Sequence, residues 1–227
     1  MNLKINRYLL TQTKWDSGSI NPLASVLHRF EKPGSYQGVI YREKESLGLF
    51  DLIVDEAAPD EQVNIDLEAI QKSRSGQSRA DISFVVSPRQ PTLFYVPRGP
   101  VGYSVVVYRS HDRKAGVEFD NRELTTGDVF ILTPILPGVY SVDNNGAARG
   151  EIIVQRREGR SIPTQPVVIE CTERGLTPNT VSCEFSQPLF FVIKGPSRIT
   201  IWIEKQYEVT RKYDRRMSHL RQKGVAS

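Results

Sequence analysis

Histidine is the side chain best suited to acid–base or metal chemistry near neutral pH, and this chain contains three of them. His28 precedes a hydrophobic run, His111 lies in the polar stretch RSHDRKAG, and His219 lies near the C-terminus. A site that combines His28 and His111 with Asp112 or Glu118 would form if two parts of the fold packed face to face. Histidine ligands usually occur in recognisable pairs, so ordinary turn or surface roles are the favoured interpretation for all three.

The other side chains that could do chemistry form no recognisable motif. The sequence has neither a Gly-x-Ser-x-Gly nucleophile elbow nor a glycine-rich phosphate loop. Cys171 and Cys183 lack a CxxC or Cys/His context, so we expect two small buried residues on neighbouring strands rather than a zinc or redox site. The sequence therefore predicts no catalytic, cofactor-binding or metal-ligating residue, and no cofactor.

Charge is distributed unevenly along the chain. The formal net charge is +4, and residues 204–224 alone carry seven basic and three acidic side chains, whereas the remainder has 23 of each sign. A carboxylate-rich stretch lies between residues 51 and 68, where the spacing is too loose for a calcium loop and favours an acidic surface. Its members are Asp51, Asp55, Glu56, Asp60, Glu61, Asp66 and Glu68. The basic C-terminal segment predicts an acidic partner.

That segment also has helical periodicity. Four apolar residues recur at i, i+4, i+8 and i+11, namely Val209, Tyr213, Met217 and Leu220. This spacing predicts a basic amphipathic helix over residues 204–224, which we call the basic tail. The expected partner-binding residues are Arg211, Lys212, Arg215, Arg216, His219, Arg221 and Lys223. The alternative is that the apolar stripe packs on the protein's own body and the arginines are merely solvated.

Strand signals dominate the rest of the sequence. Short runs rich in Val, Ile, Tyr and Phe recur between turn residues, as in YQGVIYR, LFDLIVD, ISFVVS, TLFYVP, YSVVVYR, DVFILT, GVYSVDN, EIIVQ, PVVIE, LFFVIK and RITIWIE. The spacing favours a mostly β fold built of antiparallel β-sandwiches, cupredoxin-like or immunoglobulin-like, with the basic tail as its one substantial helix. Polar linkers at 71–81 and 156–166 divide the chain into an N-terminal β unit (1–70), a second sandwich (82–155), additional strands (167–203) and the tail (204–224).

The stretch LPGVYSVDNNGAARGEIIV, residues 136–154, carries the clearest likeness to a known family. Residues 91–155, and within them the run from Phe94 to Val154, resemble a cupredoxin-like domain, whose closing hairpin reads Pro-Gly-x-Tyr before a copper-binding cysteine and a Gly-Met pair. Pro137, Gly138 and Tyr140 match that frame. Asp143 stands at the cysteine position and Ala147 and Ala148 replace the Gly-Met pair, so the resemblance implies a sandwich without copper. A comparison with cupins is weaker, because Ser141 falls where their histidine ligand would be.

A Pro-Gly-x-Tyr pattern leading into a strand occurs twice, in FEKPGSYQGVIYR and in TPILPGVYSVDNN. A duplication would produce this echo, but ordinary Pro-Gly turn chemistry is the favoured explanation. By the corner geometry of sandwiches, we expect the Tyr140 hydroxyl to bond to nearby backbone.

The interpretation that best fits these features is a non-catalytic structural or assembly subunit that binds another protein, with the basic tail as docking element. The partner would have an acidic surface, and self-assembly or a larger complex is included. An enzyme or metal-binding protein with a site near His28 and His111 is one alternative, and nucleic-acid binding through the tail is another. No apolar signal sequence or membrane span is evident, so we expect a cytoplasmic protein that does not contact a membrane.

Overall fold

The computed structural model describes residues 7–75, 82–99, 102–109, 116–156 and 165–207. Within them the chain is almost entirely β, with a 3₁₀ turn at Arg7–Leu10 and one short helix, α1 (Leu67–Ser75). The prediction of a mostly β protein is confirmed. Asp66 caps α1 by accepting a hydrogen bond from the Ala69 amide (3.0 Å), and Glu68 pairs with Lys72 one turn later.

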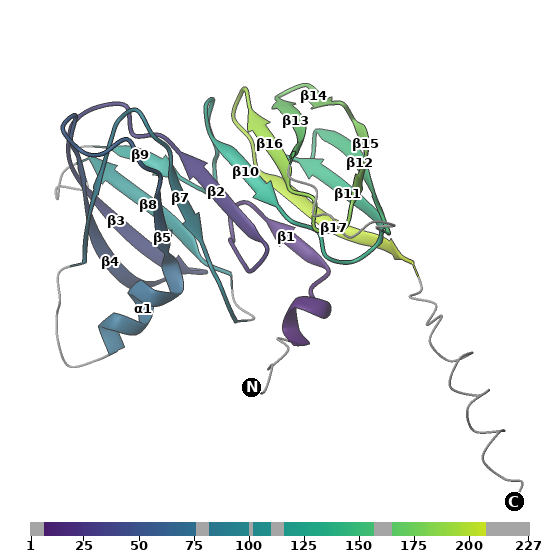
Figure 1. Cartoon of the computed structure of the whole chain (residues 1–227), viewed down its shortest axis with the longest axis horizontal. Coiled ribbons are helices and arrows are strands. Elements are labelled where there is room, and N and C mark those ends of the chain that lie inside the picture. Colours follow the sequence, from purple (N-terminus) through teal and green to yellow (C-terminus); the bar gives the residue numbers. More distant parts are fainter. Residues whose placement is uncertain (1–6, 76–81, 100–101, 110–115, 157–164, 208–227) are drawn as a thin grey trace, which may run out of the picture.

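The strands form three sheets (Figure 1). The central sheet has seven strands in the order β14-β13-β16-β10-β2-β7-β5, namely Gly175–Thr177, Val167–Thr172, Leu189–Ile193, Val129–Leu132, Ala24–His28, Thr92–Tyr95 and Val63–Asp66. The first outer sheet has the order β6-β4-β3-β8-β9, namely Ser83–Val86, Glu45–Val54, Gly34–Arg42, Ser104–Arg109 and Val117–Asp120. The second outer sheet has the order β1-β17-β11-β12-β15, namely Lys14–Asp16, Ile199–Gln206, Gly138–Asn144, Ala148–Gln155 and Thr180–Glu184.

The chain winds between these sheets as a β-solenoid of about four turns. In the first half it runs from β4 in the outer sheet to β5 in the central sheet, and then repeats the circuit through β6 and β7. β4 lies parallel to β6 and β5 lies parallel to β7, as the successive turns of a coil must. The second half repeats this with β12 parallel to β15 and β13 parallel to β16.

The predicted antiparallel sandwich of cupredoxin-like or immunoglobulin-like type is therefore wrong, and so is the cupredoxin-like resemblance of residues 91–155. The strands in that segment do not form a unit of their own: β7 pairs with β2 and β5, β8 pairs with β3, and β11 pairs with β17. Hydrophobic runs identify strands but not their partners, and the parallel pairs arise from coiling that the runs do not encode.

Two repeats of the same strand pattern make up the molecule. The first repeat spans residues 14–109 (β1 to β8) and the second spans residues 117–206 (β9 to β17). In each repeat, the third strand pairs with the fourth strand and with the last strand. β3 pairs with β4 and β8 in the first repeat, and β11 pairs with β12 and β17 in the second. The equivalent strands β2 and β10 lie antiparallel at the centre, with Val26 opposite Phe130, which relates the repeats by an approximate two-fold axis.

Each repeat gives its first strand to the other half. β1 pairs with β17 and completes the second outer sheet, whereas β9 pairs with β8 and completes the first. The exchanged strands bring large aromatic side chains with them: Phe119 stacks on Phe94 (5.1 Å between ring centroids) and Trp15 stacks on Tyr140 (5.9 Å). These four side chains are buried, so each half depends on a strand from the other for its core.

The residues that follow the exchanged strands join the repeats by hydrogen bonds. The Asn121 side chain accepts a hydrogen bond from the Val105 amide (2.7 Å), and in the equivalent place the Ser17 hydroxyl accepts one from the Ile199 amide (3.1 Å). Asn121 also donates to the Ser17 carbonyl (2.6 Å). Because Asn121 and Ser17 are buried, these bonds hold the two exchanged strands in register.

The Pro-Gly-x-Tyr echo marks equivalent positions in the two repeats. The Tyr36 hydroxyl donates to the Lys32 carbonyl and the Tyr140 hydroxyl donates to the Leu136 carbonyl, both at 2.6 Å and both over four residues. Gly138 is needed for a further reason, because a Cβ there would lie 2.3 Å from the Lys205 carbonyl oxygen.

Candidate functional site

A histidine and an aspartate meet where the two repeats join. His28 ends β2 and Asp128 immediately precedes β10, and their side chains are 2.6 Å apart between Nδ1 and Oδ1. The other carboxylate oxygen of Asp128 accepts a hydrogen bond from the Thr125 amide (2.7 Å). The Asp128 side chain is buried and that of His28 is 11% exposed, so the carboxylate fixes the orientation of the imidazole.

The imidazole of His28 is enclosed by aromatic rings. Phe30 lies edge-on at 4.5 Å and Phe119 at 4.6 Å between ring centroids. The Nε2 atom is buried and has no hydrogen-bond partner among the described residues. At the opposite end of the β2–β10 pair the corresponding residues are Ala24 and Leu132, so the polar pair occurs at one end of this junction only.

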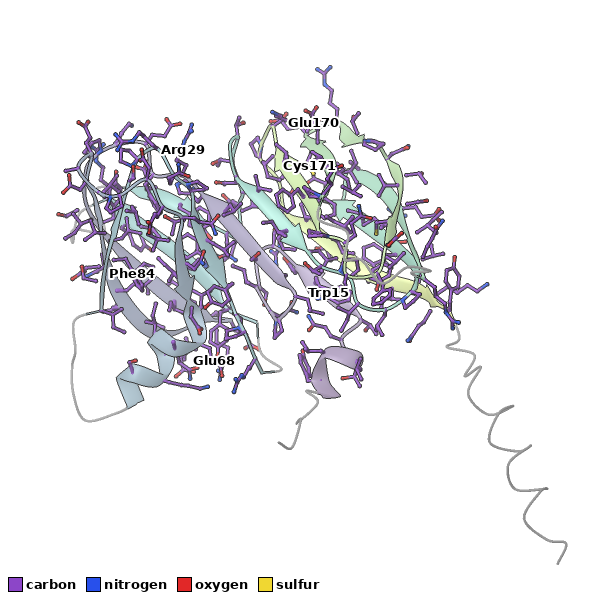
Figure 2. The ribbon with its side chains drawn as sticks, viewed as in Figure 1. Trp15, Arg29, Glu68, Phe84, Glu170 and Cys171 are labelled. Carbon is purple, nitrogen blue, oxygen red and sulfur yellow. The ribbon has the colours of Figure 1, made fainter. Side chains whose placement is uncertain are left out.

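A cavity of about 520 Å³ opens beside this pair, and Figure 2 places one of its residues, Arg29, at the top of the first half. Glu118 also lines it, so the structure brings together two members of the predicted His28 site. His111 and Asp112 lie outside the described residues. Among the described residues no group of three or more histidine, cysteine or carboxylate side chains could hold a metal ion. Sequence reasoning missed Asp128, the aspartate of a Gly-Asp turn a hundred residues from His28.

A second candidate is the outward face of the first outer sheet, which we call the apolar face. Its exposed aliphatic side chains are Leu49 and Ile53 on β4, Val85 on β6 and Val117 on β9, each 40–57% exposed. Val39 and Val106 lie on the same face, opposite each other and next to Leu49, and are fully buried. Asp51 lies between Leu49 and Ile53 on the same face of β4, so the exposed aliphatic side chains of this strand flank one carboxylate.

The equivalent face of the second outer sheet, which we call the polar face, differs at five of six positions. The pairings set these equivalences: Val39 with Asp143, Leu49 with Arg149, Val85 with Ser182, Val106 with Thr200, Val117 with Lys14, and Ile53 with Ile153. The aliphatic pair of Val39 and Leu49 corresponds to an ion pair, with 4.0 Å between Asp143 and Arg149. The first outer sheet thus exposes more aliphatic side chains than the second, although both carry a carboxylate at one equivalent position, Asp51 and Glu151.

The polar face also carries a small hydrogen-bonded network. Ser141 donates to Glu204 (2.9 Å) and the Trp202 indole donates to the same carboxylate (2.6 Å). At the other end Arg198 pairs with Asp16 (2.9 Å), which helps to raise the pKa of that guanidinium. These groups suit contact with water, because their charges are exposed or only partly buried.

No protein family, curated protein or solved structure matches this chain. The two surfaces must therefore be interpreted from their own chemistry. Among the described residues, no helix has the length and apolar character to cross a membrane.

Acidic side chains lie next to the apolar face. The loop that follows β4, residues 55–61, has four carboxylates and no basic residue: Asp55, Glu56, Asp60 and Glu61, all exposed. Asp60 binds Arg89 (2.6 Å) and Ser87 (2.8 Å), and the hydrogen bond from Arg89 is the main cause of its lowered pKa. The loop begins two residues after Ile53, so a negative rim adjoins the apolar surface.

The residues singled out for partner binding, Arg211 to Lys223, lie outside the described residues. The start of the predicted tail helix does not, and Glu204, Lys205 and Gln206 belong to β17. Cys171 and Cys183 are buried and free, as expected, but they lie in different sheets, on β13 and β15. Burial raises the pKa of both thiols to about 12, which makes them poor nucleophiles at neutral pH.

Proposed function

We propose that this chain is a non-catalytic assembly subunit that binds another protein through the apolar face, with the basic tail as a second docking element. The observation that carries the proposal is the contrast between the apolar face and the polar face. Two equivalent sheets experience the same folding requirements, so those requirements do not account for exposed aliphatic residues on only one of them. Contiguous exposed apolar surface is a mark of protein interaction sites.

Covering the apolar face with a partner protein would contribute a favourable free energy of association. Each Å² of apolar surface removed from water contributes roughly 25 cal/mol, so covering Leu49, Ile53 and Val85 contributes several kcal/mol to association. Ile53 and Val85 are directly opposite in the parallel β4–β6 pair, which makes them a continuous patch. The acidic rim beside them would select the charge of the partner.

Capture of partner proteins from the source cell tests this proposal. The bait is the full chain, and the variant is Val85→Lys, which places a charge in the apolar face. Val168→Lys is the matched control, because Val168 lies on β13 of the central sheet and is 48% exposed against 52% for Val85. We expect the Val85 variant to lose partners that the control retains. Equal capture by both variants would contradict the proposal.

A ligand-binding or acid–base function at the His28–Asp128 cavity is the second candidate, supported by the buried Nε2 atom that lacks a partner. A ligand that forms a hydrogen bond with His28 Nε2 would supply the partner that this buried atom lacks. Thermal denaturation of the chain and of His28→Phe with a panel of small acids, amines and divalent cations tests this candidate. A compound that stabilises the parent but not the variant supports it, and a panel without such a compound counts against it.

A further inference from the structure

We infer that the partner of the apolar face is a second copy of this chain, whose basic tail docks there and links the molecules head to tail. This inference rests on the proposed function and names the occupant of the same surface. It follows from three observations: the chemistry of the tail, the chemistry of the apolar face with its rim, and the place where the chain leaves the fold.

The tail and the apolar face have complementary composition. In sequence the tail combines four regularly spaced apolar residues with Arg211, Arg215, Arg216 and other cations. The apolar face offers exposed aliphatic side chains, and the adjoining loop offers Asp55, Glu56 and Glu61, whereas Asp60 is already paired with Arg89. Apolar residues beside basic ones on one partner thus match apolar residues beside acidic ones on the other.

The polar face is a poorer match for the same segment. The positions equivalent to Leu49 and Val117 are Arg149 and Lys14, so a basic segment would meet like charges there. The position equivalent to Val39 is Asp143, which is already engaged by Arg149 and by the Gly146 amide (2.6 Å). The polar face also carries the exposed carboxylates Glu151 and Glu204, so the apolar face is distinguished from it by its exposed aliphatic side chains rather than by charge.

The described residues end, after β17, at the half that does not carry the apolar face. β17, the last strand, belongs to the second outer sheet, and its final residue Gln206 pairs with Gly138. In Figure 1 this end of β17 lies on the right, whereas β3 and β4 lie on the left. A tail that leaves one half and a binding surface on the other half are the two parts of a heterologous contact between copies.

A heterologous contact of this kind is not saturated within a dimer. Each copy retains one free tail or one free apolar face, so association continues into rings or filaments. We therefore expect the average mass of the full chain to rise with concentration beyond that of a dimer. The basic and acidic groups make the association weaker at 1 M salt, where the Debye length falls to about 3 Å.

Mixing two variants tests the inference most sharply. Val85→Lys disrupts the apolar face and leaves the tail unchanged. Arg215→Glu combined with Arg216→Glu reverses two charges of the tail and leaves the apolar face unchanged. Each full-length variant alone should associate at least roughly tenfold more weakly than the parent. A one-to-one mixture retains a single functional contact, so it should form dimers and no larger species. Val168→Lys should associate like the parent, and circular dichroism verifies that every variant is folded.

The outcomes separate this inference from the proposed function. A monomeric parent at all concentrations, or a one-to-one mixture of the two variants that stays monomeric while the parent associates, would overturn head-to-tail docking. Docking of the tail on its own apolar face would give monomers throughout and would also overturn it. If the chain does not self-associate but Val85→Lys still loses cellular partners, only the identity of the occupant is wrong. If neither measurement responds to Val85→Lys, the apolar face is not a binding surface.

Discussion

Replacing Trp15 with alanine tests the exchange of first strands between the repeats. Trp15 lies on β1, is 1% exposed and sits opposite Ile201 of β17 (Figure 2 places it among the strands of the second half). Truncating a buried tryptophan costs about 3–5 kcal/mol through lost burial and the cavity left behind. The Nε1 atom also donates to the Pro22 carbonyl at 3.3 Å, a long bond whose loss adds at most about 1 kcal/mol. Since domains are stable by about 5–15 kcal/mol, Trp15→Ala should remove a large part of the total.

The strands that Trp15→Ala destabilises are as informative about the exchange of first strands as the loss of unfolding free energy. Hydrogen exchange read by mass spectrometry should show faster exchange in β11 and β17 of the second outer sheet, and urea unfolding gives the free energy. Phe119→Ala is the matched variant, because Phe119 occupies the equivalent position in β9 and stacks on Phe94 of the first half. That change should accelerate exchange in β3 and β8 instead. If Trp15→Ala acts mainly on β3 and β8, the exchange of strands has been assigned wrongly.

The corner tyrosines should behave alike: Tyr36→Phe and Tyr140→Phe should each lower the free energy of unfolding by about 1 kcal/mol, and clearly unequal losses in urea titrations would count against their equivalence. Gly138→Ala should destabilise the chain by more than either, because its Cβ would lie 2.3 Å from a backbone oxygen; an unchanged melting temperature would refute this. Burial raises the pKa of Cys171 and Cys183 to about 12 from 9.0, so the folded chain keeps these protons when the unfolded chain has lost them. Stability should therefore fall as pH rises above about 9, and substituting both cysteines with alanine should flatten that part of the urea-measured profile.

The sequence identified the strands well because local composition determines them. All of the hydrophobic runs listed as strand signals, from YQGVIYR in β3 to RITIWIE in β17, lie in strands of the structure. What composition could not supply was which strand pairs with which, since a coil and a sandwich use the same alternating runs. Helix α1 was missed because its residues overlap a polar stretch that was interpreted as a linker.

The repeat is visible in the sequence at one place, the shared Pro-Gly-x-Tyr pattern. The favoured explanation attributed that pattern to turn chemistry alone and so did not predict the repeat. The two repeats differ too much in residue type to be aligned by inspection, although their strands follow the same order and pair in the same way. The His28–Asp128 pair was beyond reach for another reason. Its members meet only because β2 and β10 are neighbours, a fact of topology rather than of local pattern.

The apolar face did leave a signal. In LFDLIV the inward residues Phe50, Leu52 and Val54 are apolar, and the outward residues are Leu49, Asp51 and Ile53. In the corresponding strand β12, the outward residues are Arg149, Glu151 and Ile153. The greater number of outward aliphatic residues in β4 than in β12 is the trace that the apolar face leaves in the sequence.

Photo-crosslinking from equivalent positions of the two outer sheets tests the account most directly. Benzoylphenylalanine replaces Val85 on the apolar face in one sample and Ser182, its equivalent on the polar face, in another; both positions are exposed on edge strands. We expect abundant cross-links to protein from position 85, including peptides from residues 208–227 of a second copy, and few from position 182. Equal yields from the two positions, or cross-links mainly from position 182, would contradict it.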